Sequence, residues 1–75
     1  MTQQEIYDLC IEYGACVQSY VDDAINYDGV GNEQHAAIMI MLENILMQAG
    51  VIIDQEYRRR WVRDIIEAGL KAKNL

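Results

Sequence analysis

The amino-acid sequence predicts an all-α fold, a small antiparallel three-helix bundle. Proline and phenylalanine are absent, and the 5 glycines are scattered, which favours long helices over strands joined by turns. Apolar residues recur by threes and fours in three segments, which is the spacing of amphipathic helices. Short turn-forming stretches separate these segments and favour antiparallel neighbours. We therefore expect a single helical domain over residues 1–75, with helices at about 3–27, 33–49 and 54–72.

The first helix should begin at the capping box formed by Thr2 and Glu5. In this motif the threonine oxygen accepts from the glutamate amide, and the glutamate side chain reaches back to the threonine amide. An apolar stripe follows, made of Ile6, Leu9, Cys10, Tyr13, Cys16, Val17, Tyr20, Val21 and Ala24. The helix should end near Gly29, which suits the left-handed position after a helix.

The two cysteines give no evidence of a disulfide or a metal site. Cys10 and Cys16 point about 120° apart around the helix axis, so they cannot bridge within the chain. We expect both to be buried as small apolar side chains. His35 is the only histidine, and this set of ligands is too sparse for zinc, so no metal or cofactor is expected.

The second helix, capped by Asn32, is apolar on nearly every side. Its main face contains Ile38, Met39, Met41, Leu42, Ile45, Leu46 and Ala49. Ala36, Ile40 and Met47 lie on another side, near Glu43, which we expect to face water. Such a helix is typical of contact with another molecule. We therefore predict a homo-oligomer, a dimer in the simplest case, that associates through Ala36, Ile40 and Met47, with Tyr7 and Ile11 as the next candidates.

The third helix, capped by Asp54, should be anchored in the core by Trp61, with Tyr57 and Ile65. Its charged residues include acid–base pairs at i, i+4, which are typical of a solvated helix surface. Arg58 and Arg59 have no acidic partner nearby in the sequence and should leave some positive character exposed.

Charge is segregated along the chain. Residues 1–57 contain ten acidic residues and no Lys or Arg, whereas residues 58–75 contain six cations and two acids, so −10 and +4 give the net charge of −6. Five acids should form one face of the first helix: Glu5, Asp8, Glu12, Asp22 and Asp23. Such a face is suited to a basic, nucleic-acid-handling protein partner. The competing interpretation is an ordinary solvated surface.

The alternative function is nucleic-acid binding. The second helix, the turn and the third helix loosely suggest a helix-turn-helix, in which Arg58, Arg59 and Arg63 would contact the nucleic acid. Ten acids in the rest of the chain would repel phosphates, so we expect nucleic acid not to be the partner.

Catalysis is not expected, because the chain has no set of nucleophile, base and orienting group and no phosphate-binding glycine loop. We also expect no signal peptide and no membrane span, which implies a cytoplasmic protein, in the host cell if a phage encodes it. Small acidic proteins without catalytic residues are typical of regulators, inhibitors and adaptors, including those of phages and mobile elements. The leading prediction is an acidic helical protein-interaction module that acts as a regulator or inhibitor.

Overall fold

The structure, a computed structural model, describes residues 1–74 and contains three helices. These are α1 (Gln3–Asn26), α2 (Glu33–Gln48) and α3 (Gln55–Lys73), and the described residues include no strand. The helix ends differ from the expected ones by a single residue. The prediction of an all-α fold is therefore confirmed.

Side chains at the N-termini explain why the helices begin where they do. The oxygen of Thr2 accepts from the amide of Glu5 at 3.1 Å, and the Glu5 carboxylate accepts from the amide of Thr2 at 3.1 Å. Asn32 and Asp54 cap α2 and α3 in the same manner, each accepting from amides of the first turn. Each cap satisfies amide groups that have no partner within the helix.

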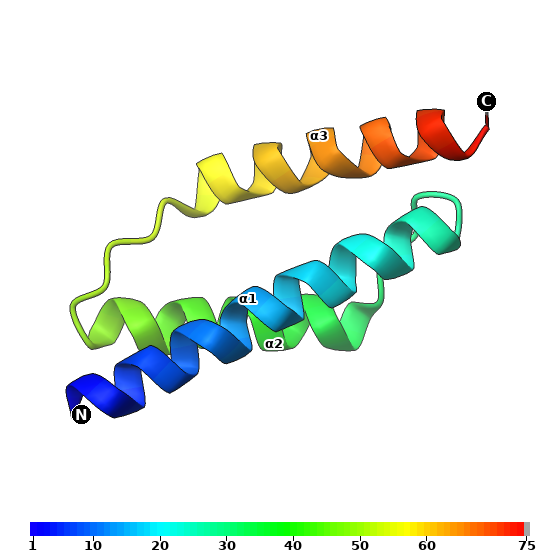
Figure 1. The fold of residues 1–75 in the computed structure, drawn as a ribbon. Coiled ribbons are helices and arrows are strands. Elements are labelled where there is room, and N and C mark those ends of the chain that lie inside the picture. Colours follow the sequence, from blue (N-terminus) through cyan, green and yellow to red (C-terminus); the bar gives the residue numbers. More distant parts are fainter. Residues whose placement is uncertain (75) are drawn as a thin grey trace.

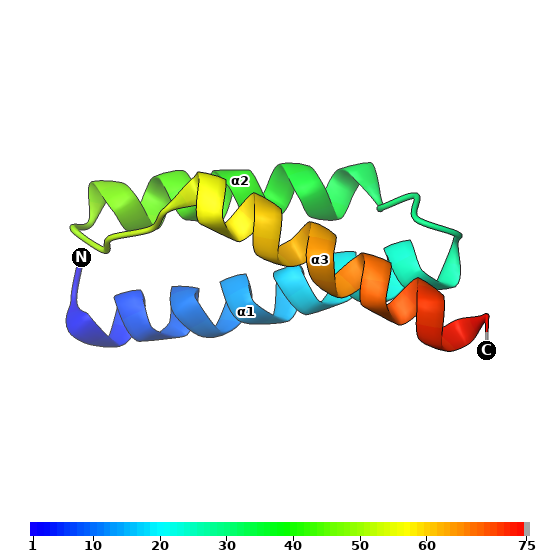
Figure 2. The same ribbon diagram turned by 90° about the horizontal axis from the view of Figure 1, so that it is seen from above.

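The helices form two layers (Figure 1). The chain runs along α1, returns along α2 beside it, and runs forward again along α3 in the second layer, so the two termini lie at opposite ends. Figure 2 shows that α3 crosses the lower layer obliquely, from above α2 at its start to above α1 at its end. Accordingly α1 packs against both other helices, whereas α2 and α3 contact each other only weakly.

The core is small and the molecule is elongated. The buried apolar side chains are Val17, Val21, Ala24, Met39, Leu42, Leu46 and Val62. The molecule measures 46 × 19 × 18 Å and has a radius of gyration of 13.5 Å, against about 11 Å for a compact chain of this length. No helix within residues 1–74 is long and apolar enough to cross a membrane.

The buried face of α3 differs from the predicted one. Trp61 is 45% exposed and Tyr57 is 61% exposed, while Val62 is buried. The prediction that Trp61 and Tyr57 anchor the helix in the core is therefore wrong. Val62 and Ile65, which belong to the same predicted apolar face, do pack in the core, and Arg58 faces the lower layer beside Val62.

The buried face of α2 also differs from the predicted one. Glu43, which we expected in water, is fully buried, and Ile38 and Met41 are exposed. The cysteine prediction was wrong for Cys10, which is exposed. Cys16 is half-buried, and its thiol donates to the carbonyl of His35 at 3.2 Å.

Candidate functional site

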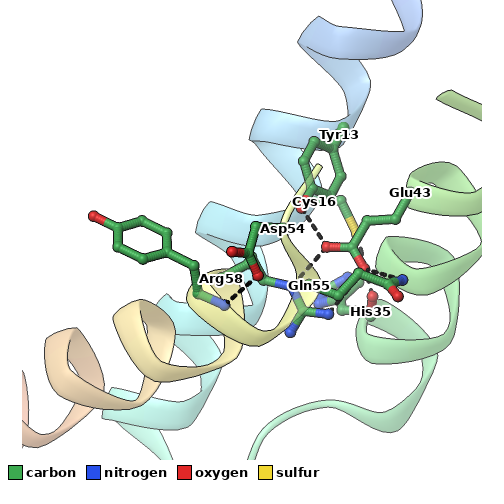
Figure 3. Close-up of polar contacts among 8 residues, drawn as sticks. Tyr13, Cys16, His35, Glu43, Asp54, Gln55 and Arg58 are labelled. Atoms are coloured by element: carbon green, nitrogen blue, oxygen red, sulfur yellow. Dashed lines mark hydrogen bonds and ion pairs between the residues drawn. The ribbon is translucent and has the colours of Figure 1, made fainter. Parts of the chain in front are cut away.

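Glu43 is the centre of a polar network that joins all three helices (Figure 3). Arg58 of α3 donates from Nε to Oε2 at 2.6 Å and from Nη2 to Oε1 at 2.9 Å. Gln55 of α3 donates to Oε1 at 3.0 Å, and the hydroxyl of Tyr13, on α1, donates to Oε2. Four donors thus surround one carboxylate, and the arginine binds it with the two-point geometry of a strong charged pair.

The network keeps Glu43 charged and Tyr13 protonated. Burial raises the pKa of Glu43, but the hydrogen bonds from Arg58, Tyr13 and Gln55 outweigh it, so the pKa lies below its usual value. Burial, followed by the interaction with Glu43, raises the pKa of Tyr13 from 10.0 to about 12. The carboxylate therefore remains an acceptor and the phenol a donor through the ordinary pH range.

The network changes the interpretation of Arg58. Arg58 has no acidic partner nearby in the sequence, but the Glu43 carboxylate, fifteen positions earlier, binds it between α2 and α3, so the expectation that Arg58 leaves positive charge exposed is wrong. The sequence contained a signal for this pair: Glu43 lies four residues after Met39 and three before Leu46, within the stripe that is buried. A buried acid at that position needs a cation nearby.

The predicted acidic face of α1 is exposed over most of its length. Asp8, Glu12 and Asp22 are exposed, and we call these three residues the acidic strip. Glu5 is exposed as well, but its carboxylate takes part in the N-cap, and the hydrogen bonds from Thr2 lower its pKa.

Asp23 is directed away from the acidic strip. Its Oδ2 lies 2.9 Å from Nδ1 of His35, in the first turn of α2. This distance is short enough for an ion pair, but the two groups are not oriented for a hydrogen bond. This contact joins the last turns of α1 to the first turn of α2.

The other arginines lie on the surface of α3. Arg59 lies 3.6 Å from Glu56, three residues before it, so the expectation that Arg59 has no acidic partner nearby is wrong, and Arg63 lies 3.6 Å from Asp64. These side chains are mostly exposed, so the pairs contribute little to stability. Their predicted role in binding stays a prediction.

Two grooves flank α3 because it crosses the lower layer obliquely. The groove between α2 and α3 has a volume of about 530 Å³ and includes Ala36, Ile40, Arg59 and Arg63 in its lining. Arg58 lines it as well, so the groove brings together two of the predicted self-association residues and all three predicted basic residues. Met47 is half-buried and lies outside this lining.

The groove between α1 and α3 has a volume of about 540 Å³, and its lining includes Tyr13, Gly14, Val17, Trp61 and Ile65. Sequence reasoning missed this groove because it placed Trp61 in the core. The sequence signal that could have indicated an exposed apolar surface on α3 was its pair of aromatic residues, Tyr57 and Trp61.

Nothing in the described residues indicates a bound cofactor. Residues 1–74 contain no group of three or more His, Cys, Asp or Glu side chains placed to hold a metal ion. The chain matches no protein-family model, no curated protein and no solved structure. Its function must therefore be inferred from its own surfaces.

Proposed function

We propose that the protein is a non-enzymatic interaction module of the cytoplasm, an antiparallel three-helix bundle whose acidic strip binds a basic, nucleic-acid-handling protein. In this role it acts as a regulator or inhibitor by covering the surface that its partner offers to nucleic acid. The observation that carries the proposal is the exposure of Asp8, Glu12 and Asp22 on a helix that contains no lysine or arginine.

The acidic strip has the dimensions of a protein-binding patch. Fourteen residues separate Asp8 from Asp22, which corresponds to about 21 Å along the helix. The first 57 residues carry a charge of −10, so a basic partner is attracted before contact and association is faster than for an uncharged pair.

Direct nucleic-acid binding has less support. Arg58 is occupied by Glu43, which leaves Arg59 and Arg63 of the three predicted contact residues for phosphates. The net charge of −6 opposes their attraction to nucleic acid.

Affinity capture from a host-cell extract tests the proposal with two variants of equal charge. The strip variant carries Asp8→Asn, Glu12→Gln and Asp22→Asn. The control variant carries Asp28→Asn, Glu33→Gln and Glu67→Gln, three exposed acids elsewhere. We expect the wild type and the control to retain nucleic-acid-binding proteins that added RNA or DNA displaces, and the strip variant to lose them.

Two results would contradict the proposal. Equal capture by the strip variant would show that these carboxylates do not bind the partner. Retardation of DNA or RNA by the purified protein at physiological salt would favour the arginines of α3 instead.

A further inference from the structure

The isolated chain exposes more surface than a compact monomer of its size. Its accessible surface is 5399 Å², whereas a folded monomer of 8.6 kDa has about 4700 Å². The excess of about 700 Å² is close to the 800 Å² that one partner contributes to a stable interface. An interface of ordinary area with one further molecule would bury this excess surface.

Gly14 of α1 and Trp61 of α3 line the same groove, and exposed apolar side chains continue along each helix from these two residues. On α1, Tyr7, Ile11 and Gly14 follow each other at i, i+4 and i+7, so they share one side of the helix. Tyr7 and Ile11 are exposed, and Gly14 lines the α1–α3 groove. On α3, Tyr57 and Trp61 are exposed, and Trp61 lines the same groove. We call these five residues the α1–α3 face.

Gly14 has no structural explanation within a single chain. A glycine inside a helix costs about 1 kcal/mol relative to alanine, and an added Cβ at Gly14 would meet no atom within 4 Å. At Gly69, by contrast, an added Cβ would lie 2.4 Å from Cδ1 of Ile25, so that glycine makes room for α1 against α3. Glycine 14 would make room in the same way for a backbone or side chain that belongs to another molecule.

The charges around the α1–α3 face complement each other between two copies. Asp22, which is also part of the acidic strip, lines the groove on the α1 side, and Arg60 and Asp64 lie beside Tyr57 and Trp61 on the α3 side. In a two-fold pair with α1 of one copy against α3 of the other, Asp22 of each copy would meet Arg60 of its partner, and the contact would occur twice. We propose that a second copy of this chain covers the α1–α3 face and forms a homodimer.

The α2–α3 groove is a poorer site for a two-fold contact. Its lining holds Arg59 and Arg63 in addition to Arg58, which is paired with Glu43 and lines both grooves, and Glu67 is the only acid in this lining. A second copy seated there would bring arginines from both chains together, and like charges across an interface oppose association. We therefore prefer the α1–α3 face, which contains Tyr7 and Ile11, to the self-association surface predicted first, which consists of Ala36, Ile40 and Met47.

Sedimentation equilibrium of matched variants tests this proposal. Ile11 and Ile40 are both about half exposed, so glutamate at either position leaves the monomer folded, as helix content by circular dichroism will verify. We expect the wild type to reach twice the 8.6 kDa chain mass. Ile11→Glu buries two unpaired carboxylates per dimer and should raise the dissociation constant at least ~100-fold, while Ile40→Glu should change it by less than ~3-fold.

Gly14→Leu separates loss of the dimer from loss of the fold. Leucine favours the helix more than glycine does, and its first side-chain atom meets open space in the single chain. We expect this variant to keep or increase its helix content and to weaken the dimer.

The proposal is overturned if the wild type remains monomeric at the highest soluble concentration. It is equally overturned if Ile40→Glu dissociates the dimer and Ile11→Glu does not, because the α2–α3 groove would then be the interface.

Discussion

Glu43 shows how one side chain can decide the orientation of a helix. Its carboxylate is the only charged side chain that is fully buried in residues 1–74, and its four hydrogen bonds come from α1 and α3. A buried ion pair often adds little net stability compared with apolar side chains of the same volume. We infer that the pair instead selects which face of α3 meets α1 and α2.

Removal of Arg58 alone should be severely destabilising. Arg58→Met leaves a buried carboxylate without its cation, at a cost of about 3–5 kcal/mol. This is a large part of the stability of a small domain, and circular dichroism should show a mostly unfolded chain. The double variant Arg58→Met, Glu43→Leu should recover most of the helix, and Arg59→Met should stay within about 0.5 kcal/mol of the wild type. Equal effects of Arg58→Met and Arg59→Met would refute a structural role for the pair.

The loss of folding stability at acidic pH should depend on Glu43. Since its pKa is lowered on folding from the usual 4.5, its contribution is complete above that value and is lost as the pH falls through the folded pKa. The urea midpoint of the wild type should therefore fall more steeply below pH 4.5 than that of Glu43→Gln. Parallel curves for the two proteins would contradict the charged state of Glu43.

The loss of folding stability at alkaline pH should depend on Tyr13. Its pKa rises from 10.0 in the unfolded chain to about 12 in the fold, so the unfolded state loses this proton first and stability declines between these two values. Tyr13→Phe has no proton to lose, and its urea midpoint should fall less over the same range. An unchanged slope in this variant would place the phenol outside the network.

The boundaries of the helices could be predicted from the sequence, but two of their buried faces could not. Caps such as Thr2 and Asp54 act on neighbouring residues, so local spacing is enough to find them. The orientation of α3 depends on Glu43, fifteen positions before Arg58. Judged by hydrophobicity alone, Trp61 is the obvious core residue, and hydrophobicity gives no sign of the long-range ion pair that turns Arg58 inward.

The two helical glycines should respond oppositely to alanine. Gly69→Ala places a Cβ against Ile25, and overpacking of this kind costs about 1–3 kcal/mol, against a gain of about 1 kcal/mol in helix propensity. In dilute solution, where single chains predominate, Gly14→Ala gains helix propensity and has no overpacking to offset it. Thermal unfolding should therefore show a lower or equal midpoint for Gly69→Ala and a higher one for Gly14→Ala. A higher midpoint for both would mean that α3 does not press on α1 at Gly69.

At the scale of the whole molecule, shape and charge point to association. A thin bundle with a core of seven apolar side chains leaves tyrosine, isoleucine and tryptophan exposed, and burial of such side chains stabilises a complex by about 1.5–3 kcal/mol each. We propose the α1–α3 face as this surface for a second copy and the acidic strip as the charged surface for a basic partner. The three residues of the acidic strip could be predicted from spacing alone. Spacing also assigned Asp23 to this face, but the turn between α1 and α2 brings His35 against it.

Trp61 reports directly on the central claim, the burial of the α1–α3 face by a second copy. It is the only tryptophan in the chain and is 45% exposed in the monomer. Its fluorescence emission can be recorded, with iodide quenching, from nanomolar to near-millimolar protein. We expect a shift to shorter wavelength and weaker quenching as the protein concentration rises, and no such change in Gly14→Leu over the same range. Emission and quenching of the wild type that stay constant over the whole range would contradict this claim.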